Sequence, residues 1–345
     1  MKSAIIRYGL SIAVGLGVIA ILCLVGHETP LRVIEILLNT SLGDRYDLSV
    51  TLFYATHLMF CAAGLCLAFE AGLFPIGAEG QLSLACLMTT IVALMLPPSF
   101  FSVVIVLFVG LGSSLLLGLI VGYFKCRKNA HEVITSMMLN FIVAAFADYM
   151  ISHHFQSQVS QNPETAKIAA KYWLFGPIFH SGSSPANTTF FIAVLVCIGT
   201  WYFMMKTRPG FEIRTVGKNV GVARNSGISI NKIYFLVLGL SALLAGFGAW
   251  NQILGYAHKY QIGFSADYGF LAIAVALMAR NNPLAVIPNS LFFAILLNGA
   301  PGLDIETNFI TRDFVKIIQA VLILTFLVLQ KQREKIRAAA NARSQ

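Results

Sequence analysis

The stretch LFPIGAEGQLSLA places a carboxylate and an amide between two long apolar runs. Pro75 breaks any helix that precedes it, and Gly77 and Gly80 allow another backbone to approach closely. Glu79 then falls in the first turn of the next apolar helix, where the helix dipole favours a negative charge by roughly 0.3–1 kcal/mol. Besides a direct contact of Glu79 with a transported solute, two interpretations stay open. The stretch is a helix start packed against a neighbour, or it is a gating element in which Glu79 and Gln81 hold one conformation by hydrogen bonds.

Asn140 and Asp148 are polar residues within another long apolar run. They are eight residues apart, so both fall on one face of a helix. Unpaired polar groups are costly in hydrocarbon, and both side chains are therefore expected to face the interior of a helix bundle. A hydrogen bond between helices and a contact with a transported solute are both open for Asn140, whereas Asp148 lies nearer the outer surface.

Aromatic side chains offer a second kind of contact, because they can stack on a planar ligand. Trp250 and Phe270 are candidates, although aromatic residues near membrane surfaces usually serve as anchors. Asp267 and Tyr268 are interpreted as an N-cap and an interfacial tyrosine at the outer face.

No metal or enzyme site is predicted. Two possible metal ligands, His57 and Cys61, lie one turn apart, which falls short of a closed site. The sequence has no phosphate-binding G-x-x-x-x-G-K-[ST] loop and no H-E-x-x-H or G-x-S-x-G motif. We therefore expect no cofactor on this chain and no catalysis by it.

The elements that must position these residues are membrane helices. The chain has 345 residues, of which 57% are hydrophobic and 11% charged, against roughly 25% charged in soluble domains. Its apolar runs of about 20 residues can cross a hydrocarbon core of about 30 Å. The composition predicts an all-α, polytopic membrane protein with about ten transmembrane helices. The expected spans are 8–26, 49–69, 79–96, 101–124, 132–152, 188–205, 233–254, 267–279, 284–299 and 313–330, of which 267–279 and 284–299 are short for a bilayer.

Basic residues indicate the orientation of these spans. Most of the 24 Lys and Arg residues fall on the cytoplasmic side if both termini are cytoplasmic. The excess of basic residues, which gives the net charge of +9, then lies beside anionic lipid headgroups. It therefore does not indicate that the protein binds nucleic acid. This topology makes 153–187 an extracytoplasmic loop, 206–232 a cytoplasmic loop of short helices suited to docking, and 331–345 a basic cytoplasmic tail. Residues 27–48 contain an amphipathic segment.

Four segments in order resemble one family over about residues 50 to 330. FEAGLFPIGAEGQLSLA is similar to the NIGAEGQ segment of permeases in ABC importers for nucleosides and simple sugars, within the branched-chain permease superfamily. HEVITSMMLNFIVA and YGFLAIAVALMARNNPLAV resemble that family's NEVISTLMLNYIA and GFDGIAVALLGRNNP. TRPGFEIRTVGKNVGVARNSGI resembles its cytoplasmic loop, with a VG-x-N step and a closing SGI.

The resemblance implies a single permease domain over 1–345, of the type II importer kind, in a bacterial cytoplasmic (inner) membrane. It implies a second permease subunit, identical or different, a cytoplasmic ATPase that uses the ATP, and an extracytoplasmic binding protein. Taken together with the residue chemistry above, the candidate residues fall into three groups: Pro75, Asn140, Trp250, Phe270 and Leu271 in the substrate pathway, Gly77, Glu79, Gly80 and Gln81 in gating, and Phe211, Arg214, Gly217, Asn219 and Arg224 in coupling to the ATPase. On this assignment Gly217→Trp keeps the protein in the membrane but uncouples ATP hydrolysis from transport.

Two positions depart from the family pattern. Pro75 stands where the family has asparagine before IGAEGQ, and Leu271 stands where it has the aspartate of GFDGIA. A less polar pathway suits riboflavin, which relatives of this family also transport. The competing hypotheses are an ion-coupled secondary transporter, which is expected to carry paired carboxylates near the membrane midplane, and a membrane scaffold without transport.

Overall fold

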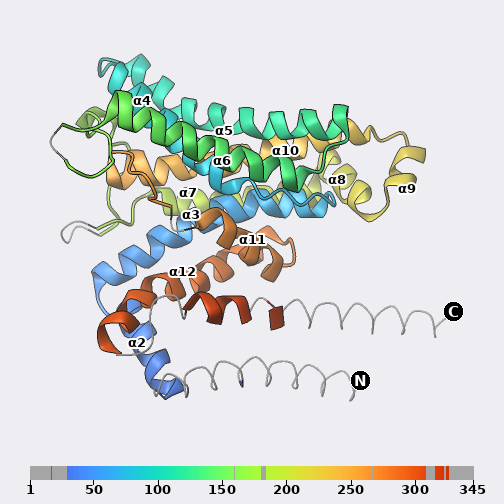
Figure 1. The fold of residues 1–345 in the computed structure, drawn as a ribbon. Coiled ribbons are helices and arrows are strands. Elements are labelled where there is room, and N and C mark those ends of the chain that lie inside the picture. Colours follow the sequence, from blue (N-terminus) through green and yellow to red (C-terminus); the bar gives the residue numbers. More distant parts are fainter. Residues whose placement is uncertain are drawn as a thin grey trace. The chain divides into compact units, whose positions relative to one another are not determined.

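The computed structural model describes residues 17, 29–158, 160–179, 184–265, 267–307, 315–321 and 324–325. These residues form helices joined by turns and extended segments, with only isolated β-bridges among them (Figure 1). The all-α prediction is therefore confirmed for the described part of the chain. Almost all of span 8–26, half of span 313–330 and the whole tail 331–345 lie outside the described residues.

In the described part of the chain, seven helices are long and apolar enough to cross a membrane. They are α3 (Arg45–Glu70), α4 (Ala78–Met95), α5 (Phe100–Lys128), α6 (Glu132–Met150, continued to Phe155 by a π-helix), α7 (Thr189–Lys206), α10 (Ile230–Gly246, continued to Ala257 through the π-helix η3, Trp250–Ala257) and α12 (Pro283–Glu306). A further apolar helix, α11 (Tyr268–Met278), has 11 residues. The short length expected for span 267–279 is confirmed, whereas the short length expected for span 284–299 is wrong because α12 has 24 residues.

Two compact units make up the chain, and the first comprises Met1–Thr51 and Phe292–Gln345. Within it, α2 (Pro30–Leu42) buries an apolar stripe against the second half of α12, in agreement with the amphipathic pattern of 27–48. A Cβ on Gly299 would lie 2.7 Å from the Leu37 carbonyl oxygen, and one on Gly302 would overlap Thr40. This close packing accompanies the continuation of α12 beyond residue 299, where the predicted span ended.

The second unit comprises Leu52–Leu291. In it α10 packs along α5, and α4 packs against both α5 and α6 (Figure 1). Gly118 and Gly122 of α5 face α10, where a Cβ on Gly118 would overlap Leu238 and one on Gly122 would lie 3.0 Å from Phe235. This G-x-x-x-G pair therefore lets α5 and α10 pack closely.

The predicted cytoplasmic loop 206–232 contains two short helices, α8 (Arg208–Lys218) and α9 (Val220–Asn225). Thr207 Oγ1 accepts a hydrogen bond from the Gly210 N–H and caps α8. Asn219 Oδ1 accepts from the N–H groups of Gly221 and Val222 and caps α9. The short-helix character expected from the sequence is confirmed, and two side-chain caps define where these helices begin.

Candidate functional site

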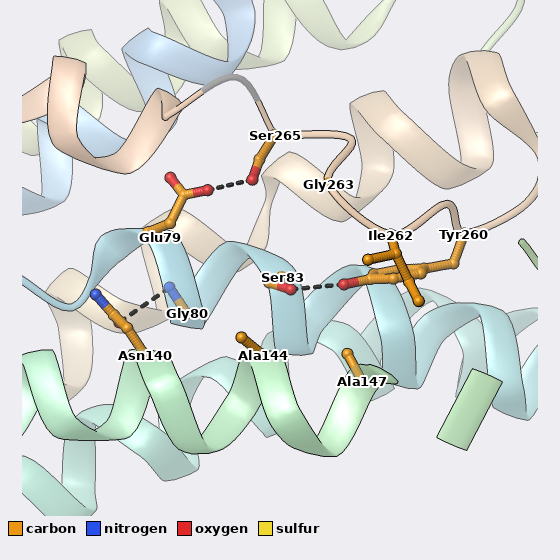
Figure 2. Close-up of a pocket in the computed structure, with 10 residues that line it drawn as sticks. All are labelled: Glu79, Gly80, Ser83, Asn140, Ala144, Ala147, Tyr260, Ile262, Gly263 and Ser265. Carbon is orange, nitrogen blue, oxygen red and sulfur yellow. Dashed lines mark hydrogen bonds between the residues drawn. The ribbon is translucent and has the colours of Figure 1, made fainter. Parts of the chain in front are cut away.

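A cavity of about 150 Å³ lies between α4, α6 and the non-helical segment that follows η3 (Figure 2). Its lining consists of Glu79, Gly80, Ser83, Asn140, Ala144, Ala147, Tyr260, Ile262, Gly263 and Ser265. Half of these residues carry a carboxylate, hydroxyl or amide group. Non-helical backbone at membrane depth is tolerated where it is buried in protein or lines a cavity, and the 260–265 segment fits that description.

Asn140 holds the start of α4 from the neighbouring helix α6. Its Oδ1 accepts from the Gly80 N–H at 3.0 Å, and its Nδ2 donates to the Ile76 carbonyl at 2.7 Å. The N-cap of α4 is Gly77, which has no side chain to satisfy the first N–H groups of the helix. Asn140 therefore acts as a cap supplied by another helix, and the predicted hydrogen bond between helices is present.

Two further side chains of α6 satisfy the extended backbone before α4. Ser136 Oγ accepts from the Ile76 N–H at 2.9 Å, and Glu132 Oε1 accepts from the Phe74 N–H at 3.3 Å. Lys125 pairs with Glu132 at 2.7 Å. Because residues 132, 136 and 140 are four apart, they form one stripe on α6, and this stripe binds the segment that Pro75 keeps out of a helix.

Glu79 joins α4 to the beginning of α11. One carboxylate oxygen accepts from the Ser265 hydroxyl, and the other accepts from the Gly269 N–H at 2.7 Å. Asp267 occupies the N-cap position of α11 but makes no capping hydrogen bond with its side chain, so the predicted capping by Asp267 is wrong. The carboxylate of Glu79 caps α11 from outside, and a Cβ on Gly269 would overlap the Glu79 backbone.

Tyr268 lies inside the unit, and its interpretation as an interfacial tyrosine is wrong. Its side chain is buried and stacks on His57 with the ring centroids 4.9 Å apart. His57 is itself buried, in the middle of α3. The segment leading into α11 therefore returns from the end of η3 into the helix bundle.

Ser83 and Tyr260 close the other end of the cavity. Their hydroxyl groups are 2.7 Å apart (Figure 2), and Tyr260 is buried. Neither residue was predicted, nor was Ser265. Residues 258–267 resemble an ordinary polar connection between two apolar runs, and nothing in their sequence shows that they contact α4.

The predicted gating residues divide between two places. Glu79 and Gly80 line the cavity, whereas Gly77 and Gln81 lie together beside Ser136 in a narrow crevice between α4, α5 and α6. Gln81 is buried there.

The structure brings only one predicted pathway residue, Asn140, to the cavity. Trp250 instead donates from Nε1 to the Leu107 carbonyl at 2.8 Å and stacks on Phe175. Pro75 is buried outside the lining, and Phe270 and Leu271 lie on α11 without lining the cavity. The two departures from the family pattern therefore do not alter the polar wall of this cavity.

The predicted coupling residues lie on α8 and α9. Phe211 and Arg224 are exposed, Asn219 caps α9, and Arg214 lies along α8 with its Nε 3.4 Å from the Gly210 carbonyl. Gly217 is at a close backbone approach, and the backbone that it approaches is that of Glu70 and Ala71 in this chain. The exposed surface of these helices is apolar at Phe211 and Val222, which are 61% and 54% exposed.

The sequence matches the family described as branched-chain amino acid transport system / permease component over residues 48–327. It is 29% identical to a glucose ABC transporter permease of Haloferax volcanii, over 92% of this chain and 84% of that protein. It is also 29% identical to a nucleoside ABC transporter permease of Lactococcus lactis subsp. cremoris, over 90% of this chain and 86% of that protein. A candidate riboflavin import permease of Treponema pallidum is 25% identical over 79% of this chain and 72% of that protein. Because the family match extends over most of its length, the chain belongs to this family of ABC transporter permeases.

Proposed function

We propose that this permease carries a nucleoside or a simple sugar across a bacterial cytoplasmic membrane as part of an ABC importer. The cavity beside Glu79 is the observation that supports this substrate class. Its carboxylate, amide and three hydroxyl groups suit a ligand with several hydroxyl groups, because such ligands need both donors and acceptors. Glucose and nucleosides, the solutes named for the two relatives at 29% identity, share that chemistry.

The riboflavin hypothesis has less support from the cavity. It rested on Pro75 and Leu271 making the pathway less polar, and neither residue lines the cavity. The polar part of riboflavin is a hydroxylated chain, but its flat ring system has no counterpart among the lining residues, of which Tyr260 is the one aromatic.

The proposed pathway is shared with a second permease subunit. A volume of about 150 Å³ is below the roughly 300–1,000 Å³ of sites that enclose a small-molecule ligand. A second permease, identical or different, would complete the pathway, and an extracytoplasmic binding protein would deliver the solute. Rearrangement of the contacts of Glu79 is the proposed gate.

A separate cytoplasmic ATPase is proposed to supply the energy. The described residues form helices and connecting segments without a nucleotide-binding domain, and the sequence has no phosphate-binding loop. Helices α8 and α9 provide a compact docking element, with Phe211 and Val222 as its exposed apolar contacts.

Uptake into proteoliposomes tests this proposal. The purified chain with its co-purified partners and binding protein is supplied with labelled nucleoside, glucose or riboflavin. ATP-dependent uptake of nucleoside or glucose is the expected result, and preferential uptake of riboflavin would overturn the substrate assignment. Uptake by this chain alone, driven by an ion gradient without any ATPase, would favour the secondary transporter.

A further inference from the structure

The loop between α6 and α7 is bound along the segment that follows η3. The Thr165 N–H donates to the Tyr260 carbonyl at 2.9 Å, and the Ile168 N–H donates to the His258 carbonyl at 2.8 Å. Lys259 adds an ion pair with Glu164 at 2.6 Å. Because the same segment continues to Ser265 in the cavity, this loop has a direct backbone connection to the candidate site.

Among the described residues of this loop, Trp173 is the large hydrophobic side chain that is exposed. Its ring stacks on that of His258 with the centroids 4.2 Å apart and the planes at 11°, yet Trp173 remains 48% exposed. Nearby Tyr172 is buried and its hydroxyl lies 3.1 Å from the Leu96 carbonyl. The stack therefore presents one supported aromatic face at the surface of this loop.

The exposed charge beside this aromatic face is positive. Lys167 and Lys171 are exposed, and Lys171 Nζ donates to the Pro98 carbonyl at 3.0 Å. Glu164 is buried and neutralised by Lys259. Among the described residues of 156–178, Lys167 and Lys171 are the only exposed charged side chains.

We propose that Trp173, with Lys167 and Lys171, forms the docking surface for an acidic face of the solute-binding protein. Exposed tryptophans that sit on a rigid support are frequent anchors of protein interfaces, and the two lysines supply charge that steers an acidic partner. The inference rests on the proposed function, because it requires a binding protein to deliver the solute.

Docking at this surface acts on the cavity through residues 258–265. His258 holds a left-handed conformation with φ of +57°, which is uncommon for a residue other than glycine. It stacks on Trp173, while the next two residues bind Glu164 and Thr165. A partner that shifts Trp173 therefore shifts Tyr260, whose hydroxyl contacts Ser83 in the cavity wall.

The test uses the complete transporter in nanodiscs of zwitterionic lipid and the binding protein that supports uptake by the wild-type complex. Trp173→Ala, and the double variant Lys167→Glu with Lys171→Glu, are each expected to weaken binding by about tenfold or more. The double variant is also expected to reduce the salt dependence of binding. Matched controls are Tyr202→Ala, another aromatic that is 59% exposed, and Arg127→Glu with Lys128→Glu, which make the same charge change at exposed positions on α5.

Glu164→Gln tests the connection to the cavity separately. It leaves the docking side chains in place but removes the charge that binds Lys259, so it is expected to retain binding and lose stimulation of ATP hydrolysis by the binding protein. Equal stimulation in this variant and the wild type would overturn the connection.

The remaining outcomes distinguish the proposals. Wild-type affinity in both surface variants would overturn the docking surface while leaving the importer intact. A loss of affinity that appears only when anionic lipid is added would assign Trp173 to lipid anchoring instead. Uptake by the wild-type complex that needs no binding protein would overturn that part of the proposed function, and the docking surface with it.

Discussion

Replacing Asn140 by leucine tests whether α6 caps the start of α4. The substitution keeps the approximate size of the side chain and removes two hydrogen bonds. In one, Asn140 Oδ1 accepts from the Gly80 N–H at 3.0 Å, and in the other, Asn140 Nδ2 donates to the Ile76 carbonyl at 2.7 Å. Both backbone groups then lose their side-chain partner at a place where α4 has no cap of its own.

The expected loss of stability follows from these two bonds. Side-chain hydrogen bonds between membrane helices contribute on average about 0.6 kcal/mol and at most about 1.7 kcal/mol. Two of them give about 1–3 kcal/mol, which agrees with the roughly 0.5–2 kcal/mol lost with a helix cap. Gly80 and Asn140 are also closely packed, because a Cβ added at Gly80 would lie 2.9 Å from the Asn140 Cα. The branched leucine side chain has little room beside this contact, which adds to the loss of stability.

The assay is unfolding of the purified protein in mixed micelles with increasing sodium dodecyl sulfate. Met138→Leu is the matched control, because Met138 lies on the same helix but is 51% exposed. We expect the free energy of unfolding to fall by about 1–3 kcal/mol for Asn140→Leu and to stay unchanged for Met138→Leu. If both variants unfolded like the wild type, the capping argument would be refuted.

Four further predictions concern other contacts. Gly269→Ala is expected to separate α11 from Glu79 and to lower uptake severely, whereas Gly199→Ala, with nothing within 4 Å of its added Cβ, should transport normally in the same uptake assay. Gly217→Trp is expected to displace α8 from the Glu70 carbonyl and to uncouple ATP hydrolysis from uptake, and normal coupling in that variant would contradict the packing of α8 on α3. Phe211→Asp with Val222→Asp should abolish co-purification of the ATPase without changing the yield of the permease, whereas retention of the ATPase would exclude these side chains as its main contacts. The hydrogen bond from Lys259 lowers the pKa of Glu164 below its ordinary value of 4.5, so the contact stabilises the loop above that pH and is lost as the pH falls through the lowered pKa. The protection of the Thr165 N–H against hydrogen exchange, relative to its intrinsic rate at each pH, should therefore fall in acid in the wild type, and an equal fall in Glu164→Gln would rule out this ion pair as the cause.

The long helices were predictable because their apolar runs have the length of a membrane span. The break at Pro75 and the short helices of the 206–232 loop were also predictable, since proline, glycine and side-chain caps act locally. Asn140 was identified as a polar residue that needs a partner, and the structure supplies that partner in the backbone of Ile76 and Gly80.

The part of the site that escaped prediction depends on contacts distant in sequence. Glu79 bonds to residues 186 and 190 positions further along the chain, and no local pattern links them. The π-helix at Trp250–Ala257 was missed because its composition is that of an ordinary apolar helix. The full length of α12 was missed because Gly299 and Pro301 resemble a helix end, although the packing of Gly299 against α2 shows that the glycine serves a close contact.

The stripe of Glu132, Ser136 and Asn140 has a consequence for how this chain can vary. Each residue added to an α-helix turns everything beyond it by about 100°. One residue inserted between Ser136 and Asn140 would turn Asn140 away from Gly80 while leaving Glu132 and Ser136 in place. The number of residues in this part of α6 is therefore fixed by the backbone that it holds.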